Sequence, residues 1–291
     1  MLPGITLLCF FASYTVALIV EFAKLWGRTP WHRLAVIGFA GAGLIAHSIY
    51  LYNRMNPAEG EPGLLSNWYQ WCLVVAWVLM GAYLGLKFAR PEMAIGLFML
   101  PLVLALIAIA RIFQKTESFS NAAATQWWGL FHGVALLFGT VSVLIAFVAG
   151  LMYLVQSSRL RQIPPPQDGL ELPSLEWLER LSSRSLVIST IFLAIGLVSG
   201  VVMNLTRSTP LPWTDAVIVS SGVLFLWLIC CTIFEFAYRP AQQGQKVAYL
   251  TVAHFLFLCL AVGFALWAGH GGTSEKPSSE LPPSAREEAG R

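Results

Sequence analysis

Long apolar runs separated by short polar stretches dominate the chain. Eight of these runs have the length that a helix needs to cross about 30 Å of hydrocarbon. They cover residues 3–23, 34–53, 68–87, 93–113, 129–155, 186–206, 216–237 and 247–268. The pattern therefore predicts an all-α fold: a polytopic membrane helix bundle of about eight transmembrane helices, forming one domain over residues 1–270.

Two polar segments do not fit a transmembrane helix. Residues 164–185 begin with three prolines, which cannot continue the fifth helix. Leu175, Leu178 and Leu181 then recur at helical spacing, which predicts a short amphipathic helix over about 171–185 that lies along the inner membrane surface. Residues 271–291 have almost no apolar side chains to bury and are predicted to form a disordered tail.

The composition agrees with an integral membrane protein. Of the 291 residues, 57% are hydrophobic and only 11% are charged, against roughly 25% charged residues in a typical soluble domain. The net charge of +3 is too small and too dispersed to indicate nucleic-acid binding. The N-terminus has no basic region before its apolar run, so we expect a retained helix rather than a signal peptide. All five cysteines lie in apolar runs without a CxxC motif, which indicates neither a disulfide framework nor covalent haem attachment.

The distribution of Lys and Arg predicts the orientation of the bundle. The loops after the first, third, fifth and seventh helices hold eleven of these residues. The other loops hold four, or seven when the C-terminal tail is counted. By the positive-inside rule, both termini are expected outside a multi-pass protein of the cell inner (cytoplasmic) membrane.

His132 stands near the start of the fifth predicted helix, in the sequence WWGLFHGVALLFG. An ionisable ring in a spanning segment is costly unless it has a partner, which makes His132 a candidate ligand for a metal or a haem iron. Gly129 and Gly133 make the same helix face small enough for another backbone or a flat porphyrin to approach. The alternative is that His132 lies in the headgroup zone beside the interfacial Trp127 and Trp128.

His270 follows the eighth predicted helix and comes out on the same, outer side of the membrane as His132. Two neutral imidazoles from two helices can ligate opposite faces of one porphyrin, so the pair is a candidate bis-histidine site for non-covalent haem b. Glycines on both sides of His270 allow its backbone to adjust to a ligand. The alternative is that His270 merely begins the polar tail and binds nothing.

Other polar groups within the predicted helices have simpler interpretations beside the functional ones. His47, in the outer half of the second helix, requires either a hydrogen-bond partner, a haem or a water-filled cavity. For His254, in the inner third of the eighth helix, a structural hydrogen bond is favoured, and Glu21 is expected to pair with Lys24. The outer cations can pair with haem propionates or, as we favour, with lipid headgroups; they are Arg111, Lys115 and Arg207.

Three stretches together resemble a known family. They are the segment around His132, WWGLFHGVALLFGTVSVLIAFVAGLMYLV; the segment LPSLEWLERLSSRSLVISTIFLAIGLVSGVV; and the terminal GFALWAGHGG. In these stretches the chain resembles the cytochrome c assembly protein family, over roughly residues 127–270 and more loosely in LIAHSIYLYNR of the second helix. Eight spans also suit the shorter, HemX-like members of that family.

The resemblance implies haem binding in the membrane. It matches His132 and His270 to the two haem-ligand histidines of the external face, and His47 to the histidine of an early helix. Haem-handling members of the family also carry a tryptophan-rich loop between the helices that correspond here to the sixth and seventh. This chain has only MNLTRSTPLPWTD there, which retains Trp213 and Asp215. This departure favours a HemX-like accessory or regulatory role over a complete haem exporter and synthetase.

Three functions therefore remain open. The first and favoured one is a membrane haem-binding protein of cytochrome c assembly, which handles or delivers haem near the outer face for apocytochrome c or other assembly proteins. The second is a HemX-like regulator of haem biosynthesis. The third is a small-molecule transporter without haem, although the helices lack the paired Gly/Pro breaks that mark a midplane site. No nucleophile–base pair, phosphate loop or metal-hydrolase spacing is present, so no enzymatic activity is expected.

Overall fold

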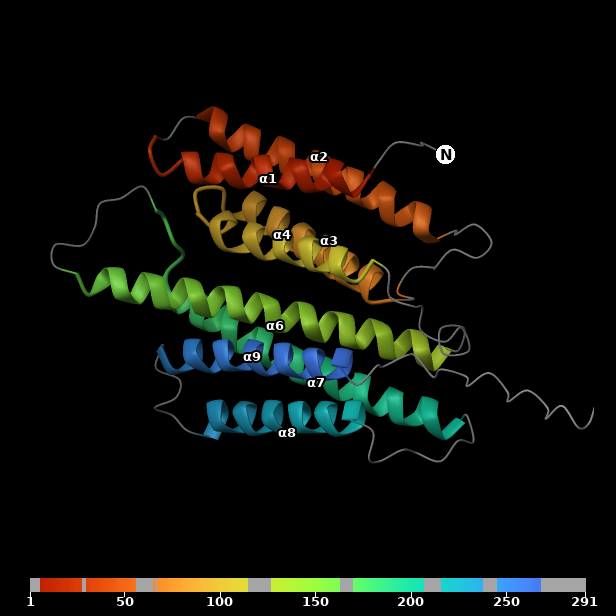
Figure 1. Ribbon diagram of the computed structural model, residues 1–291. Helices are drawn as coiled ribbons and strands as arrows, with labels where there is room; N and C mark the ends of the chain where they lie inside the picture. The colour runs from red at the N-terminus through yellow and green to blue at the C-terminus, as the bar shows by residue number, and fades with distance from the viewer. Residues whose placement is uncertain are drawn as a thin grey trace, which may run out of the picture.

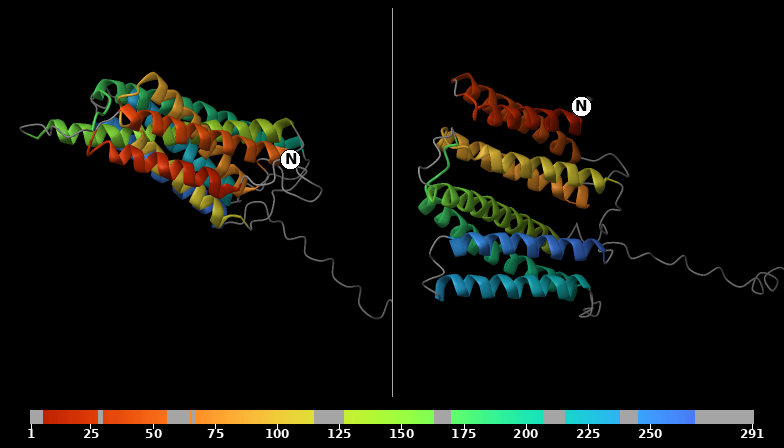
Figure 2. Two further views of the ribbon diagram at one scale, coloured as in Figure 1. Left: turned by 90° about the horizontal axis from the view of Figure 1, so that it is seen from above. Right: turned by 60° about the vertical axis from the view of Figure 1, so that its left-hand side comes forward.

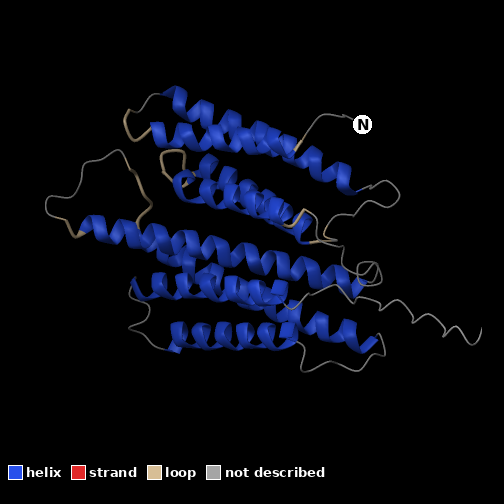
Figure 3. Cartoon of the chain, in the orientation of Figure 1, coloured by secondary structure: helices blue, strands red, loops and turns tan. Residues whose placement is uncertain are grey.

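The computed structural model describes residues 6–27, 30–55, 65, 67–114, 127–162, 170–206, 216–237 and 245–267. Within these residues the chain forms eight helices and no strand (Figure 3). The helices are α1 (Leu7–Ala23), α2 (Pro30–Met55), α3 (Trp68–Ala89), α4 (Gly96–Ile112), α6 (Trp127–Leu160), α7 (Leu175–Thr206), α8 (Ala216–Ala237) and α9 (Gln245–Trp267). The predicted all-α class is confirmed, and each helix overlaps one predicted span.

Length and hydropathy identify a membrane protein. Four helices, α2, α3, α6 and α7, contain segments long and apolar enough to cross a membrane. The other four contribute shorter apolar stretches, Leu7–Ala23, Gly96–Ile112, Gly222–Phe234 and Ala248–Gly263. The protein is therefore a polytopic membrane helix bundle. Its predicted tail, residues 271–291, lies outside the described residues.

Consecutive helices run in opposite directions and are stacked in layers (Figure 1). From one edge to the other the order is α1 with α2, then α3 with α4, then α6, then α7 with α9, and finally α8, as the right panel of Figure 2 also shows. The helix ends that carry Lys24, Lys87, Arg90, Arg159 and Arg161 lie on one side, which we call the basic end. Helices α1, α3, α6 and α8 begin at the opposite end.

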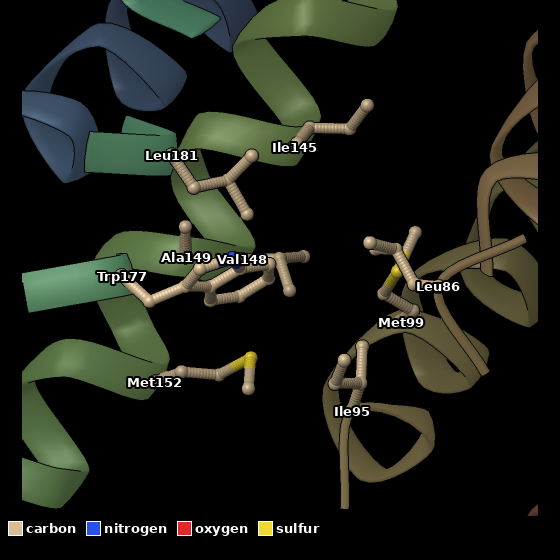
Figure 4. Close-up of a pocket in the computed structure, with 9 residues that line it drawn as sticks. All are labelled: Leu86, Ile95, Met99, Ile145, Val148, Ala149, Met152, Trp177 and Leu181. Carbon is tan, nitrogen blue, oxygen red and sulfur yellow. The ribbon is translucent and has the colours of Figure 1, made fainter. Parts of the chain in front are cut away.

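Helix α6 connects the two halves of the stack. It contacts α3 and α4 on one side and α7 and α9 on the other. The larger hydrophobic core fills α1–α4 and reaches α6, whereas a second core joins Val143, Leu193, Leu228 and Leu258 in the second half. Between the halves, side chains of α3, α4, α6 and α7, all of them apolar except for the indole nitrogen of Trp177, line a small crevice (Figure 4). Apolar side-chain contact therefore forms the seam between the two halves.

Close approach of α6 and its neighbours depends on glycines. A Cβ on Gly139 would lie 2.9 Å from Leu193 Cγ, and one on Gly196 would lie 2.7 Å from Leu136 Cδ2. On the α9 side, a Cβ on Gly150 would collide with Thr251 Oγ1. Small residues are the usual means by which membrane helices bring their backbones together, because lipid offers no hydrophobic drive for association.

The glycine contact between α6 and α9 gives a first testable prediction. Gly150→Ala is expected to lower the free energy of unfolding by about 1–3 kcal/mol, because the methyl group overpacks against Thr251 and the Ala248 carbonyl oxygen. Gly85→Ala in α3 is the matched control, since a Cβ there meets nothing within 4 Å. The control should be neutral or stabilising by up to about 1 kcal/mol through helix propensity. Unfolding in mixed micelles measures the free energy of unfolding of both variants. Equal changes in the two variants would contradict the close contact at Gly150.

The predicted surface helix over about 171–185 is wrong as a separate element. Residues 175–185 instead form the first turns of α7, which continues to Thr206 without a break. Leu178 is fully buried, and Leu181 and Trp177 pack against the larger core. The leucine stripe therefore faces protein rather than lipid headgroups. No proline or glycine separates the stripe from the following span, so nothing ends the helix between them.

A buried charge cluster joins α1 to α3. The expected pair of Glu21 and Lys24 is confirmed, with Lys24 Nζ 3.1 Å from Glu21 Oε2. The structure adds Lys87, whose Nζ lies 2.8 Å from Glu21 Oε1, and Tyr83, whose hydroxyl donates to the same oxygen at 2.9 Å. Lys87 also donates to the Met93 carbonyl at 3.0 Å. Glu21 and Lys87 are each almost wholly buried, so this cluster ties the first helix to the third inside the protein.

Candidate functional site

His132 lies in the second turn of α6 and is half-buried against α7. Its Nδ1 donates a hydrogen bond of 2.7 Å to the carbonyl oxygen of Gly196. The imidazole also rests against Gly200, where a Cβ would lie 3.0 Å from Cε1 and 3.1 Å from Nδ1 of the ring. Two glycines of α7 thus form a shallow seat that holds the ring in one orientation.

The hydrogen bond fixes which ring nitrogen is free. A backbone carbonyl only accepts, so Nδ1 carries a proton, and in the neutral imidazole Nε2 then has the lone pair. Nε2 of His132 has no hydrogen-bond partner among the described residues. A neutral histidine with Nδ1–H bound to a carbonyl and Nε2 free is the arrangement found in metal ligands, where the second contact sets the tautomer. His132 is therefore suited to ligate a metal through Nε2.

The surface beside His132 is apolar. Trp128, Leu130 and Phe131 are all strongly exposed on the first turns of α6, and the rings of Trp128 and Phe131 lie 6.4 Å apart. A Cβ on Gly133 would meet nothing within 4 Å, so the space next to this histidine is open. The free nitrogen and its open, aromatic surroundings fit a flat apolar ligand such as a porphyrin.

The seat on α7 gives a second prediction, which concerns binding at His132. Gly200→Ala should push the imidazole away by a few tenths of an ångström and lengthen its bond to Gly196. Loss of such an orienting contact typically weakens metal binding by about 10–100-fold. Haem titration followed by absorption should show this loss. Gly85→Ala, which adds a methyl group in open space on α3 and away from His132, is the control and should leave haem binding unchanged.

His47 lies in a different part of the bundle. Its ring is fully buried in α2, stacked on Phe10 at 4.1 Å between centroids, and its Nδ1 shares a hydrogen bond of 3.3 Å with the Tyr14 hydroxyl. Helix α2 does not contact α6, and the layer of α3 and α4 lies between them. The structure therefore does not bring His47 to the seat of His132. Nε2 of His47 is buried and has no hydrogen-bond partner in the described part of the chain, and a role in cofactor binding stays a prediction from the sequence.

His270 lies outside the described residues, as do Trp213, Asp215, Lys115 and Arg207. Helix α9, which precedes His270, ends at Trp267 on the side of the bundle where α6 begins (Figure 1). Arg111 donates to Gln114 Oε1 at 2.6 Å at the exposed end of its own helix. His254 makes the structural hydrogen bond that was expected, from Nδ1 to the Leu250 carbonyl at 2.7 Å.

The seat for His132 is the functional feature that sequence reasoning missed. Its signal is the sequence GLVSG at residues 196–200, which places two glycines four apart on one face of α7. Such spacing identifies a contact face but not the partner of that face. Within the described ranges, no three His, Cys, Asp or Glu side chains gather as a metal cluster.

Comparison with known protein families identifies the chain. Residues 65–271 match the family described as Cytochrome C assembly protein, which is more than two thirds of the sequence. The chain belongs to the cytochrome c assembly protein family. Neither a curated protein nor a solved structure shows a significant match. Membership supports a role in cytochrome c biogenesis for this membrane protein.

The family match divides the chain unevenly. It begins just before α3 and ends just after His270, so it contains both His132 and His270. Helices α1 and α2 precede it, and His47 therefore lies outside the matched segment. In the structure, α1 and α2 pack on each other and form the layer at one edge of the bundle. Among the other described helices, α1 contacts α4 and α2 contacts α3. The first two helices thus lie outside the matched segment, at one edge of the bundle.

Proposed function

We propose that this protein binds haem b non-covalently at the end of the bundle opposite the basic end, as part of cytochrome c assembly. The observation that carries the proposal is the bond from His132 Nδ1 to the Gly196 carbonyl, which leaves Nε2 free as a ligand. His270 is proposed as the second axial ligand, because it lies in the same family segment and directly follows α9. Haem would supply the redox-active iron, and the protein would bind and orient it.

The tasks of the chain's own groups follow from their positions. His132 would bind the iron, and the Gly196 carbonyl would keep the imidazole in the required tautomer. Gly200 would let the ring lie close to α7, while Trp128 and Phe131 would cover the apolar edge of the porphyrin. Together these groups would hold haem at the membrane surface, where an apocytochrome c or another assembly protein could receive it.

The proposed setting is the cell inner membrane, with the basic end in the cytoplasm. The excess of Lys and Arg at this end supports that orientation under the positive-inside rule. Haem bound at His132 would then lie near the outer face. Fusion of a reporter enzyme after residue 291 tests the orientation, since an outside C-terminus should activate a periplasmic reporter and not a cytoplasmic one.

A second candidate function is a HemX-like regulator of haem biosynthesis. The observation in its favour is the short connection between α7, which ends at Thr206, and α8, which begins at Ala216. So few residues leave little room for the tryptophan-rich loop of haem-handling relatives. A protein with this connection is less suited to present haem to a large partner, which favours a regulatory role.

Absorption spectroscopy of the purified, detergent-solubilised protein tests the main proposal. Reconstitution with haem b should give the reduced spectrum of a six-coordinate haem, close to one haem per chain. Deletion of the gene should then lower the level of c-type cytochromes. A protein that binds no haem, and whose deletion changes only the level of an early enzyme of haem synthesis, would instead support the regulatory function.

A further inference from the structure

Two polar side chains of the neighbouring helices α8 and α9 lie close together, in a part of the bundle away from His132. Trp227 of α8 and His254 of α9 lie with ring centroids 6.1 Å apart and planes tilted by 50°. Trp227 Nε1 and His254 Nε2 are both buried and have no hydrogen-bond partner among the residues that the structure describes. Each lies well inside its helix, at least nine residues from either end. Two orphaned polar atoms of neighbouring helices therefore share one apolar environment.

The two atoms are complementary in hydrogen bonding. His254 Nδ1 donates to the Leu250 carbonyl at 2.7 Å, so Nε2 is an acceptor. The indole Nε1–H of Trp227 can only donate. Stacking on Phe257, with centroids 4.3 Å apart and planes within 9°, holds the indole in place. One rigid donor and one rigid acceptor therefore stand side by side without bonding to each other.

Burial makes the lack of a hydrogen-bond partner for these two nitrogen atoms unfavourable. Only 1% of His254 is exposed. A buried polar atom that loses its water and gains no partner costs free energy, and the hydrocarbon of a bilayer provides no water to restore the bond. A group that accepts from the indole and donates to the imidazole would satisfy both atoms at once. A hydroxyl group has this property, since its oxygen accepts while its hydrogen donates.

We propose that Trp227 and His254 bind one hydroxyl group between α8 and α9. The hydroxyl belongs either to a water molecule or to a hydroquinone dissolved in the bilayer. It accepts from Trp227 Nε1 and donates to His254 Nε2. The site is separate from the proposed haem site, because His132 lies against Gly196 and Gly200 of α7, whereas Trp227 and His254 belong to α8 and α9.

Stability measurements on Trp227→Phe, His254→Leu and the double variant test the proposal in the full-length protein. Each single variant should lower the melting temperature by roughly 2–4 °C, since it removes one bond to the hydroxyl and strands the other. The melting temperature of the double variant should not be lower than that of the less stable single variant. Trp77→Phe calibrates the effect, because that indole donates directly to Ser48 Oγ at 2.8 Å. Single variants that are as stable as the parent, or more so, overturn the proposal.

Two further measurements identify the source of the hydroxyl. Organic extraction of the purified protein should yield a hydroquinone or quinone from the parent, and none from His254→Leu, if the ligand is a hydroquinone. If the ligand is water, the extract holds none and solid-state NMR shows a cross-peak between Trp227 Hε1 and water. Direct transfer from Trp227 Hε1 to His254 Nε2, without water or quinone, overturns the proposal because the two rings then bond to each other.

Discussion

Replacing His132 with alanine is expected to abolish the six-coordinate haem spectrum and to weaken haem binding by more than about 100-fold. This lower bound follows from a milder kind of substitution. Removing only the group that orients a metal ligand already weakens metal binding by about 10–100-fold. In His132→Ala the ligand atom itself is gone, together with its bond to Gly196. Haem titration and the reduced absorption spectrum measure the effect.

The matched control for His132→Ala is His47→Gln. His47 is also a histidine within a helix whose Nε2 has no partner among the described residues, but it lies outside the family segment and is stacked on Phe10. Glutamine keeps a polar group within reach of Tyr14, so this variant should fold and retain six-coordinate haem. If His47→Gln loses the haem while His132→Ala keeps it, the site lies among α1 and α2 instead, and the proposed seat on α7 is wrong.

Replacing Glu21 with leucine is expected to destabilise the protein by about 3–5 kcal/mol, because it leaves Lys87 as an uncompensated buried charge. Lys87 would keep only its bond to the Met93 carbonyl. Adding Lys87→Met to Glu21→Leu should restore much of the loss, since replacement of a whole buried ion pair by apolar groups is often neutral. Unfolding in mixed micelles gives the three free energies.

Lys24→Ala is the control for the buried cluster. Its side chain is 18% exposed, and ion pairs near the surface contribute only about 1 kcal/mol or less. This variant should therefore cost far less than Glu21→Leu. A double variant that is less stable than Glu21→Leu alone would show that the cluster is not held together by compensation between Glu21 and Lys87.

The position of α1 and α2 bears on how the chain relates to its family. The buried cluster attaches α1 to α3 and to the start of α4, where a Cβ on Gly96 would lie 2.8 Å from Glu21 Cγ. The layer of α1 and α2 is therefore held by buried charges at the basic end and by the apolar core elsewhere. Any function of His47 would therefore lie within the layer of α1 and α2 and not at the seat of His132.

The error over residues 171–185 shows where local patterns fail. A leucine stripe beside charged residues is equally typical of a helix on a membrane surface and of a helix that packs on protein. The sequence predicted the first, and the structure has the second, with Leu178 buried in the larger core. The stripe alone carries no information about what covers it.

Hydropathy by itself determined the helices, since an apolar run of sufficient length leaves few alternatives to a spanning helix. The eight predicted segments reappear as eight described helices, and α8 spans Ala216–Ala237 as predicted. Composition also identified a membrane protein, and His132 stood out as an ionisable residue in an apolar run. These properties are read within one contiguous window, so they need no knowledge of the rest of the fold.

Only the tertiary structure decided which faces meet. It placed His132 on the carbonyl of Gly196, which is 64 residues away in the sequence. It joined Glu21 to Tyr83 across 62 residues, and it separated His47 from His132 by the layer of α3 and α4. Hydropathy is nearly the same all round a membrane helix, so it leaves the rotation and the neighbours of each helix open. Those are set by close packing of small residues and by pairing of buried polar atoms, which depend on distant parts of the chain.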